Sequence, residues 1–300
     1  MPAGTHPTVG VIGLGSMGGA MAANMVDSGL AVTGFDLDRP RVARLVALGG
    51  GSADSPADVA DRVDVLVTSL PSQAAFEAVM VEIEHSTPAA QGGLVVVETS
   101  TLSVAAKERA HSALAPRGIT LLDCPLSGTG DQAVHRDVIV LASGDRAAVA
   151  RCEPVFAGFA RAHHYLGDFG AGSKMKFVAN LLVAIHNVAA AEALLLARAA
   201  GLDPQQTYDV ISDSAGTSRM FEIRVPKMIA GDYEPGVRTS VFMKDLAIIR
   251  GFAEEHGVPV TLFTLCARLY DLAAESGFAD QDTAAVFEIL ERARAGLRDQ

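Results

Sequence analysis

A short glycine-rich turn near the N-terminus has the residue types that bind a diphosphate group. It follows an apolar run from Val9 to Ile12 and opens a helical pattern from Met17 to Ser28. This strand, turn and helix context makes a GxGxxG segment specific for dinucleotides, because its glycines allow a tight turn, a close approach of the pyrophosphate and close helix packing. The alternative is a merely structural turn. The predicted cofactor-binding residues of the turn are Gly13, Leu14, Gly15, Ser16, Met17 and Gly18.

An acidic residue, Asp36, ends the next predicted strand, twenty-three positions after Gly13. A carboxylate at this place accepts hydrogen bonds from the ribose hydroxyls of the adenosine and repels the 2′-phosphate of NADP. The sequence therefore favours NAD as the cofactor. Arg39 and Arg41 follow closely enough for one of them to offset that repulsion, so NADP stays an alternative.

A second polar group lies on a long apolar helix predicted over Ser173 to Ala200. At 100° per residue, Lys176 and Asn180 lie about 40° apart and Asn187 about 20° from Lys176, whereas Lys174 points to another side. Unpaired amides and ammonium groups are costly to bury, so this stripe faces either solvent or a site that supplies partners. Its coincidence with a dinucleotide turn favours a site.

The elements that must position these groups fall into two different patterns. Up to about Asp168, β-branched runs alternate with helical stretches, which predicts a parallel sheet covered on both faces. The fold class is thus a Rossmann-type, doubly wound α/β domain over residues 1–168, followed by an all-helical domain over residues 169–300. The predicted strands are Val9–Ile12, Ala31–Asp36, Val63–Ser69, Leu94–Glu98, Thr120–Asp123 and Val138–Ala142.

The second half contains apolar residues at helical spacing. Its first helix is apolar nearly all round, which predicts that other helices cover it, including those of a second subunit in a homodimer or homotetramer. We expect this domain to bind substrate and to mediate dimerisation. The later predicted helices are Pro204–Ser214, Phe221–Ala230, Val241–His256, Pro259–Glu275 and Gln281–Arg294.

Composition narrows the class of protein. The net charge of −11 disfavours nucleic acid as a partner, since such affinity needs clustered Lys and Arg. The three cysteines are widely spaced and form no zinc or disulfide pattern, so we expect a reducing cytoplasm and no metal. Asn180, Asn187 and Arg198 interrupt the long apolar helix, which favours a buried helix over a membrane span.

The glycine turn continues to Met21-Ala22-Ala23-Asn24, and this longer segment resembles the N-terminal signature of the β-hydroxyacid dehydrogenases. Further segments resemble motifs of that family in the same order. They are Ser69-Leu70-Pro71, Glu98-Thr99-Ser100-Thr101, Asp123-Cys124-Pro125-Leu126-Ser127-Gly128, Gly170-Ala171-Gly172-Ser173-Lys174-Met175-Lys176 with Asn180, and Lys244-Asp245-Leu246.

The resemblance implies a role for each motif. Lys176 would be the acid/base, Asn180 would hold the substrate, and Lys244 would contact the cofactor. The loops with Leu70, Pro71, Ser100 and Thr101 would line the nicotinamide. The carboxylate of a small acid would bind Ser127 and an anion-binding nest of backbone N–H groups at Gly128 and Thr129.

The predicted function is hydride transfer between NAD(P) and a small 3-hydroxy acid or its semialdehyde or keto form. An imine reductase and a non-catalytic dinucleotide-binding scaffold are the alternatives. Lys176 argues against the first, and Lys176, Asn180 and Lys244 together argue against the second. Thr129, Gln132 and Arg136 occupy positions where the family usually has glycine, and Ala179 replaces a common asparagine. These departures leave the individual substrate open.

Three other reactive side chains have simpler interpretations. Cys124 is expected to be a small buried hydrophobe rather than a nucleophile. Arg219 and Arg224 could reach a second acidic group on the substrate, but a solvated surface position is favoured for both.

Overall fold

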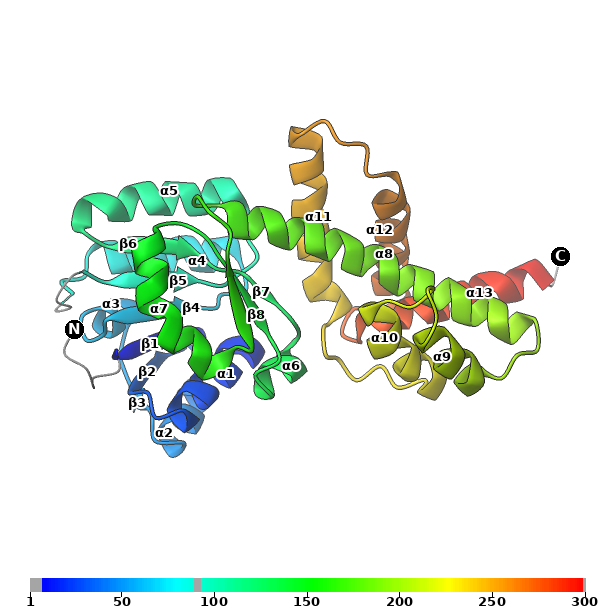
Figure 1. The fold of residues 1–300 in the computed structure, drawn as a ribbon, viewed down its shortest axis with the longest axis horizontal. Helices are drawn as coiled ribbons and strands as arrows, with labels where there is room; N and C mark the ends of the chain where they lie inside the picture. The colour runs from blue at the N-terminus through cyan, green and yellow to red at the C-terminus, as the bar shows by residue number, and fades with distance from the viewer. Residues whose placement is uncertain (1–6, 89–92, 299–300) are drawn as a thin grey trace. The chain divides into compact units, whose positions relative to one another are not determined.

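The computed structural model describes residues 7–88 and 93–298 and divides the chain into two compact units, Met1–Lys176 and Phe177–Gln300. In the first unit, six of the described strands form a parallel sheet in the order β3-β2-β1-β4-β5-β6 (Figure 1). This order reverses direction between β1 and β4, where α/β sheets bind ligands at the carboxyl ends of their strands. The strands are β1 (Val9–Ile12), β2 (Val32–Phe35), β3 (Gly51–Ser52), β4 (Val65–Thr68), β5 (Val95–Glu98) and β6 (Thr120–Asp123).

Helices cover both faces of this sheet, which explains why its central strands β1, β4 and β5 are buried at every position. One face packs against α1 (Ser16–Asp27), α2 (Arg39–Ala47) and α7 (Arg146–Phe159). The other face packs against α3 (Pro56–Ala60), α4 (Gln73–Glu84) and α5 (Val104–Leu114). The predicted doubly wound sheet is confirmed. A short 3₁₀ helix, Ala115–Arg117, follows α5.

A smaller sheet completes the first unit. It contains β7 (Leu126–Ser127), β8 (Ile139–Ala142) and β9 (Ala162–Tyr165), and α6 (Gly130–Val134) lies between β7 and β8. The strand β8 runs antiparallel to β7 and parallel to β9. Our prediction included β8 but missed β3, β7 and β9, because two-residue strands and the polar run of β9 carry little periodic signal.

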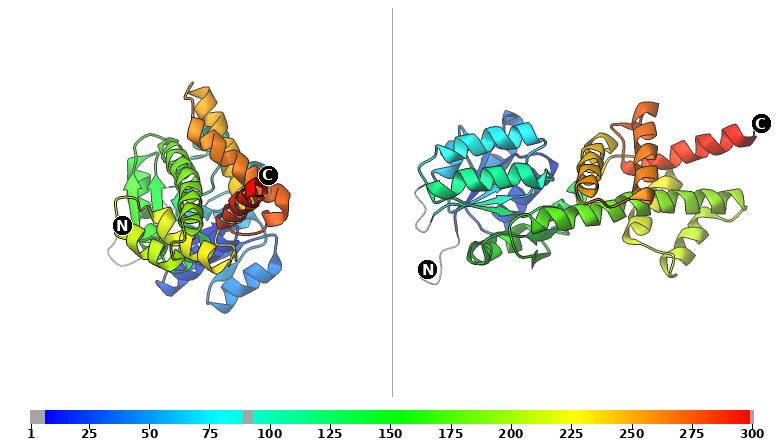
Figure 2. Two further views of the ribbon diagram at one scale, coloured as in Figure 1. Left: turned by 90° about the vertical axis from the view of Figure 1, so that its right-hand side faces the viewer. Right: turned by 90° about the horizontal axis from the view of Figure 1, so that it is seen from above.

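The helix α8 (Ala171–Ala199) is continuous across the boundary between the two units (Figure 2). It is the one described helix that has the length and hydropathy of a membrane span, a test that core helices of soluble proteins also pass. All regular elements described after it are helical, as predicted. They are α9 (Pro204–Ser212), α10 (Arg219–Ala230), α11 (Thr239–Glu255), α12 (Thr261–Ala273), a π-helical turn (Ala274–Phe278), a 3₁₀ helix (Thr283–Ala285) and α13 (Val286–Arg298).

A buried ion pair organises the second unit. Arg224, on α10, donates to Asp282 at 2.5 Å, and both side chains are almost fully buried. Asp282 also accepts the backbone N–H groups of Gly236, Val237 and Ala284. The favoured interpretation of Arg224 as a surface residue is therefore wrong. Arg219 does lie on the surface, where it pairs with Glu222.

Loss of Arg224 should destabilise the protein strongly. Removing one partner of a buried ion pair leaves an uncompensated charge, so we expect Arg224→Leu to lower the free energy of unfolding by about 3–5 kcal/mol. The exposed Arg219→Leu is the matched control and should change it by less than about 0.5 kcal/mol. Urea denaturation followed by circular dichroism measures both. Equal urea midpoints for the two variants would show that the pair contributes nothing.

Candidate active site

The glycine turn has the shape that a dinucleotide requires. Gly13 has φ of +88°, and a Cβ atom there would lie 2.2 Å from the Ser69 carbonyl oxygen. A Cβ on Gly18 would lie 1.9 Å from the Gly13 carbonyl oxygen, so α1 can approach the turn only without a side chain. By contrast, the nearest atom to a Cβ on Gly15 is Arg41 Nη1 at 3.7 Å. The backbone at Gly15 is thus open to a ligand while its neighbours are closely packed.

The first turn of α1 points toward this opening. Gly15 is the N-cap of the helix, and its cap carries no side-chain hydrogen bond. Helix N-termini have N–H groups without intrahelical partners and a positive dipole end, which together suit a pyrophosphate. The residues predicted from Gly13 to Gly18 therefore fit NAD(P).

The Asp36 carboxylate is fixed against the same turn. Its Oδ2 atom accepts the Leu14 N–H at 2.7 Å, and its Oδ1 atom accepts the Asp38 N–H at 2.8 Å. Arg41 reaches both carboxylates, with Nη1 3.4 Å from Asp36 Oδ2 and Nε 3.0 Å from Asp38 Oδ2. Arg41 is therefore engaged by two acids, one of which is the proposed ribose ligand.

The two loops predicted to line the nicotinamide are bonded to each other. Ser100 follows β5, and its hydroxyl accepts the Leu70 N–H at 2.8 Å from the loop after β4. Pro71 is exposed and Thr101 is half-buried. The loops leave the carboxyl ends of the adjacent parallel strands β4 and β5, and β4 neighbours β1, the strand that carries the glycine turn.

The predicted substrate loop approaches the glycine turn but differs from expectation at one amide. An ideal Cβ on Gly130 would lie 3.3 Å from Ser16 Cβ, so the loop touches the turn. Ser127 is half-buried at the end of β7, and Gly128 has φ of +141°. Thr129 is the N-cap of α6, and its N–H donates to Gln132 Oε1 at 3.1 Å. The prediction of a free Thr129 amide in an anion nest needs this correction, because the capping box uses it.

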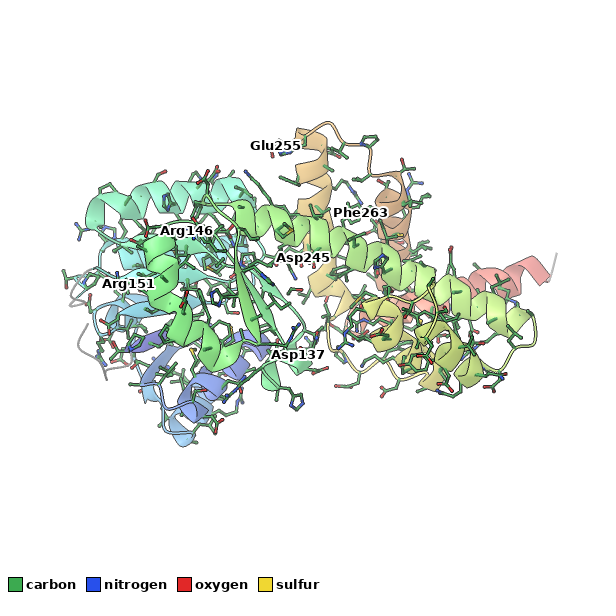
Figure 3. The ribbon with its side chains drawn as sticks, in the orientation of Figure 1. Asp137, Arg146, Arg151, Asp245, Glu255 and Phe263 are labelled. Carbon is green, nitrogen blue, oxygen red and sulfur yellow. The ribbon has the colours of Figure 1, made fainter. Side chains whose placement is uncertain are left out.

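The unusual residues of this loop have structural partners. Gln132 completes the capping box and donates through Nε2 to Asp137 at 2.9 Å. Figure 3 shows Asp137 in the segment that follows α6. Arg136 donates to Asp27 at 2.6 Å and to the Asn24 carbonyl oxygen at 3.2 Å. The Arg136 side chain is thus bonded to α1.

On α8, the two lysines have different environments. Lys174 is exposed, whereas Lys176 is 9% exposed and Asn180 is 6% exposed. Helical geometry distinguishes them in the same way, since Lys176 and Asn180 share a face. Asn187 serves another purpose, because its amide donates to the Tyr270 hydroxyl at 2.8 Å and to the Thr283 carbonyl oxygen at 2.9 Å. It belongs to the core of the second unit.

Asn180 and Lys244 meet at a residue to which we had assigned no role. The Asn180 amide donates to Asp245 Oδ2 at 3.0 Å, and Lys244 Nζ lies 3.4 Å from Asp245 Oδ1. Asp245 lies on α11 (Figure 3). Its place beside Lys244 in the Lys-Asp-Leu motif was the signal available in the sequence.

Cys124 is a core residue, as expected. Its side chain is fully buried among the residues that pack the first sheet face. Burial raises the pKa of its thiol well above the usual range, and Asp123 and Cys152 raise it further. A thiol that stays protonated is a poor nucleophile.

Two comparisons with protein families cover nearly the whole chain. Residues 8–167 match the family described as the NAD binding domain of 6-phosphogluconate dehydrogenase. Residues 170–290 match the family described as "NAD-binding of NADP-dependent 3-hydroxyisobutyrate dehydrogenase". The L-threonate dehydrogenase of Cupriavidus necator is 35% identical over 282 residues, which cover 94% of this chain and 95% of that protein.

Solved structures give the same result. A crystal structure of 3-hydroxyisobutyrate dehydrogenase from Salmonella typhimurium is 34% identical with a TM-score of 0.84, covering 94% of this chain and 99% of that one. The Mycobacterium tuberculosis 3-hydroxyisobutyrate dehydrogenase with L-serine is 28% identical with a TM-score of 0.85, covering 95% and 99%. The predicted family, NAD(P) cofactor and oxidoreductase activity are confirmed. The chain belongs to the β-hydroxyacid dehydrogenase family of NAD(P)-dependent oxidoreductases.

Proposed function

We propose that this dehydrogenase uses Lys176 as the acid/base and Asn180 to hold a small hydroxy acid. The observation that carries the proposal is the burial of these two side chains on one face of α8, while Lys174 is exposed. An ammonium and an amide on one helix face together supply N–H donors that a hydroxyl or a carboxylate oxygen can accept. The face is thus suited to a polar ligand.

The chemistry divides between the cofactor and the chain. NAD(P), when bound, accepts or supplies the hydride at the carbinol carbon. The Lys176 amine takes the hydroxyl proton when the acid is oxidised, and its ammonium form returns the proton in reduction. Asn180 orients the hydroxyl, and its own rotamer is set by the bond to Asp245.

The substrate carboxylate is assigned to the loop after β7. The Ser127 hydroxyl and the Gly128 amide are the proposed donors, and Thr129 contributes through the conformation that its cap imposes. Because Gly130 has no side chain, this loop can lie close to Ser16 of the glycine turn. A carboxylate bound there would lie next to the cofactor site.

L-Threonate is the substrate that we propose first. Relatives that share about a third of this sequence over nearly its whole length are L-threonate dehydrogenases. A structural relative was solved with L-serine. Both molecules are small acids with a hydroxyl group near the carboxylate, which is the chemistry that the proposed site recognises.

Substitution of Lys176 tests the acid/base assignment. Lys176→Met should lower kcat with L-threonate and NAD⁺ by at least about 10²-fold, the usual contribution of general acid–base catalysis. Lys174→Met is the matched control, and its kcat should stay within about twofold, as for an exposed residue away from the site. Initial rates of NADH formation measure both. Lysine-independent turnover, or no turnover with any of a panel of short hydroxy acids, would contradict the proposal.

We also propose that NAD is preferred over NADP. Asp36 faces the glycine turn and would repel a 2′-phosphate, and Arg41 is already paired with Asp36 and Asp38.

Titration calorimetry tests this preference. NADH should bind at least about tenfold more tightly than NADPH, an energy difference typical of one charged contact. Asp36→Ala should bring the dissociation constants of NADH and NADPH closer together. The substitution removes hydrogen bonds to the ribose of NADH and removes the repulsion of the 2′-phosphate of NADPH. Arg41→Ala is the control in the same titrations. It should lower the affinity for NADPH at least as much as the affinity for NADH. Tighter NADPH binding by the unsubstituted protein would reverse the assignment.

We further propose a soluble, cytoplasmic homodimer or homotetramer. The three cysteines are free and buried, which fits a reducing compartment. Along α8, the apolar side chains of Met175, Val178, Leu182 and Leu196 are between 46% and 71% exposed. Their spacing of three, four and fourteen residues places them on one side of the helix, and such an apolar stripe is suited to contact with another copy.

The stripe gives a direct test of assembly. Leu182→Glu should lower the molar mass measured by light scattering, because a buried carboxylate disfavours an apolar interface. Leu48→Glu changes a leucine of similar exposure in the first unit, and it should leave the molar mass unchanged. A monomeric unsubstituted protein, or a Leu182→Glu protein of unchanged mass, would show that this stripe is not the interface.

A further inference from the structure

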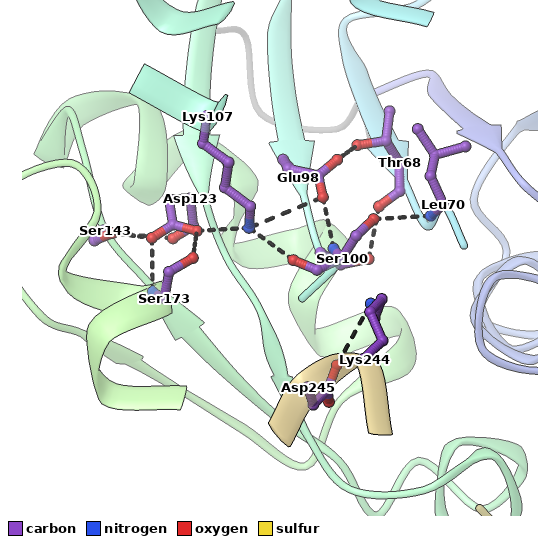
Figure 4. Close-up of polar contacts among 11 residues, drawn as sticks. Thr68, Leu70, Glu98, Ser100, Lys107, Asp123, Ser143, Ser173, Lys244 and Asp245 are labelled. Carbon is purple, nitrogen blue, oxygen red and sulfur yellow. Dashed lines mark hydrogen bonds and ion pairs between the residues drawn. The ribbon is translucent and has the colours of Figure 1, made fainter. Parts of the chain in front are cut away.

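A fully buried lysine lies among the loops of the first unit and has no role in the proposed chemistry. Lys107, on α5, has 0% exposure. Its ammonium donates to the Ser100 carbonyl oxygen at 2.7 Å and to Asp123 Oδ1 at 2.8 Å, and it lies 3.9 Å from Glu98 Oε1 (Figure 4). Lysine is rarely buried completely, so this arrangement calls for a function.

On one side, Lys107 reaches the start of α8 through Asp123. The Asp123 carboxylate accepts the Ser173 N–H and the Ser173 hydroxyl, each at 2.7 Å. The Ser143 hydroxyl contacts the same carboxylate and accepts the Gly172 N–H at 2.9 Å. The first N–H groups of a helix have no acceptor within the helix. In α8 the acceptors are side chains of β6 and of the segment after β8. Asp123 thus caps α8 from another element.

The start of α8 is also packed without spare room. An ideal Cβ on Gly172 would lie 2.3 Å from the Leu141 carbonyl oxygen and 2.7 Å from the Asp123 carbonyl oxygen. Ser173 precedes Lys176 by three residues, which places the two on the same face one turn apart. The position of Ser173 therefore fixes the position from which Lys176 extends.

On the other side, Lys107 reaches the loop predicted to line the nicotinamide. It binds the carbonyl oxygen of Ser100, whose hydroxyl accepts the Leu70 N–H. The Ser100 N–H donates to Glu98 at 2.7 Å, and the Thr68 hydroxyl also donates to Glu98. Burial raises the pKa of Glu98, and Lys107 opposes this shift. One ammonium group thus contacts both the Ser100 loop and the cap of α8.

We propose that Lys107 is a positioning residue that links the Ser100 loop to Asp123 and so sets the place of Lys176 relative to the cofactor. The inference rests on the proposed role of Lys176. Without Lys107 the buried Asp123 carboxylate loses a hydrogen bond and its counter-charge, so its burial costs more free energy. The carboxylate is then expected to shift toward water, which loosens its bonds to Ser173 and the first turn of α8.

Two variants separate positioning from simple stabilisation. Lys107→Met removes the link and leaves the Asp123 charge unpaired. Lys107→Met/Asp123→Asn also removes the link but leaves no charge at position 123, where the introduced amide can accept the Ser173 N–H and donate to its hydroxyl. Arg109→Met is the matched control on the same helix, where Arg109 is exposed and pairs with Glu77.

For each variant we would measure kcat and the affinity for NADH, the latter by nucleotide fluorescence. The kinetic isotope effect is measured with substrate deuterated at the carbinol carbon, and hydrogen exchange reports on the first turn of α8. Lys107→Met should lower kcat about 10–100-fold, the cost of misplacing a reacting group by about 1 Å. Its isotope effect should rise, its NADH affinity should stay within about twofold, and its first-turn amides should exchange at least about tenfold faster. The double variant should regain the protection and have a kcat between those of Lys107→Met and the unsubstituted enzyme.

Either folded variant with an unchanged kcat and isotope effect would overturn the proposal, whatever its melting temperature. The double variant decides the matter if Lys107→Met does not fold. A loss of NADH affinity equal to the loss of kcat would also overturn it. Lys176→Met with full turnover would contradict the proposed function instead, and the exchange data would still decide whether Lys107 holds α8.

Discussion

The carboxyl edge of the parallel sheet must satisfy its polar groups inside the protein, and much of the site depends on this constraint. Helices cover both faces of the sheet, and the side chains at the ends of β4, β5 and β6 are themselves closed off from solvent. Thr68, Glu98 and Asp123 occupy those ends and are fully buried. Their hydrogen bonds run between loops, so that the strand ends, the loops and the start of α8 are held as one polar network (Figure 4).

Much of this organisation could be predicted from the sequence because it depends on local periodicity. The runs Val9–Ile12 and Thr120–Asp123 coincide with strands β1 and β6. The long apolar helix begins and ends within two residues of the predicted positions. Helical geometry alone separated Lys174 from Lys176. The short strands β3 and β7 escaped because pairing, rather than propensity, creates them.

What the sequence did not reveal depends on contacts between distant positions. Asn187 lies on the predicted polar stripe, yet it binds Tyr270 and the Thr283 carbonyl group far along the chain. Arginine is usually a surface residue, and only the structure shows that Arg224 is buried in an ion pair with Asp282. Lys107 lies in an ordinary amphipathic helix, and its partner Asp123 is sixteen residues away on a strand. No spacing rule connects such pairs.

The anchoring of α6 bears on how substrate preference can change. Gln132 is hydrogen-bonded to both Thr129 and Asp137, and Arg136 forms an ion pair with Asp27 of α1. In the proposed carboxylate site, such a loop would lose little conformational entropy on binding an acid, which favours affinity for a ligand of matching shape. The same residues stabilise the fold, so a substitution that reshapes the pocket also removes a cap or an ion pair. A shift to a new acid is therefore expected to need a compensating change in α1 or α6, and the accepted substrate and the stability of the first unit should vary together.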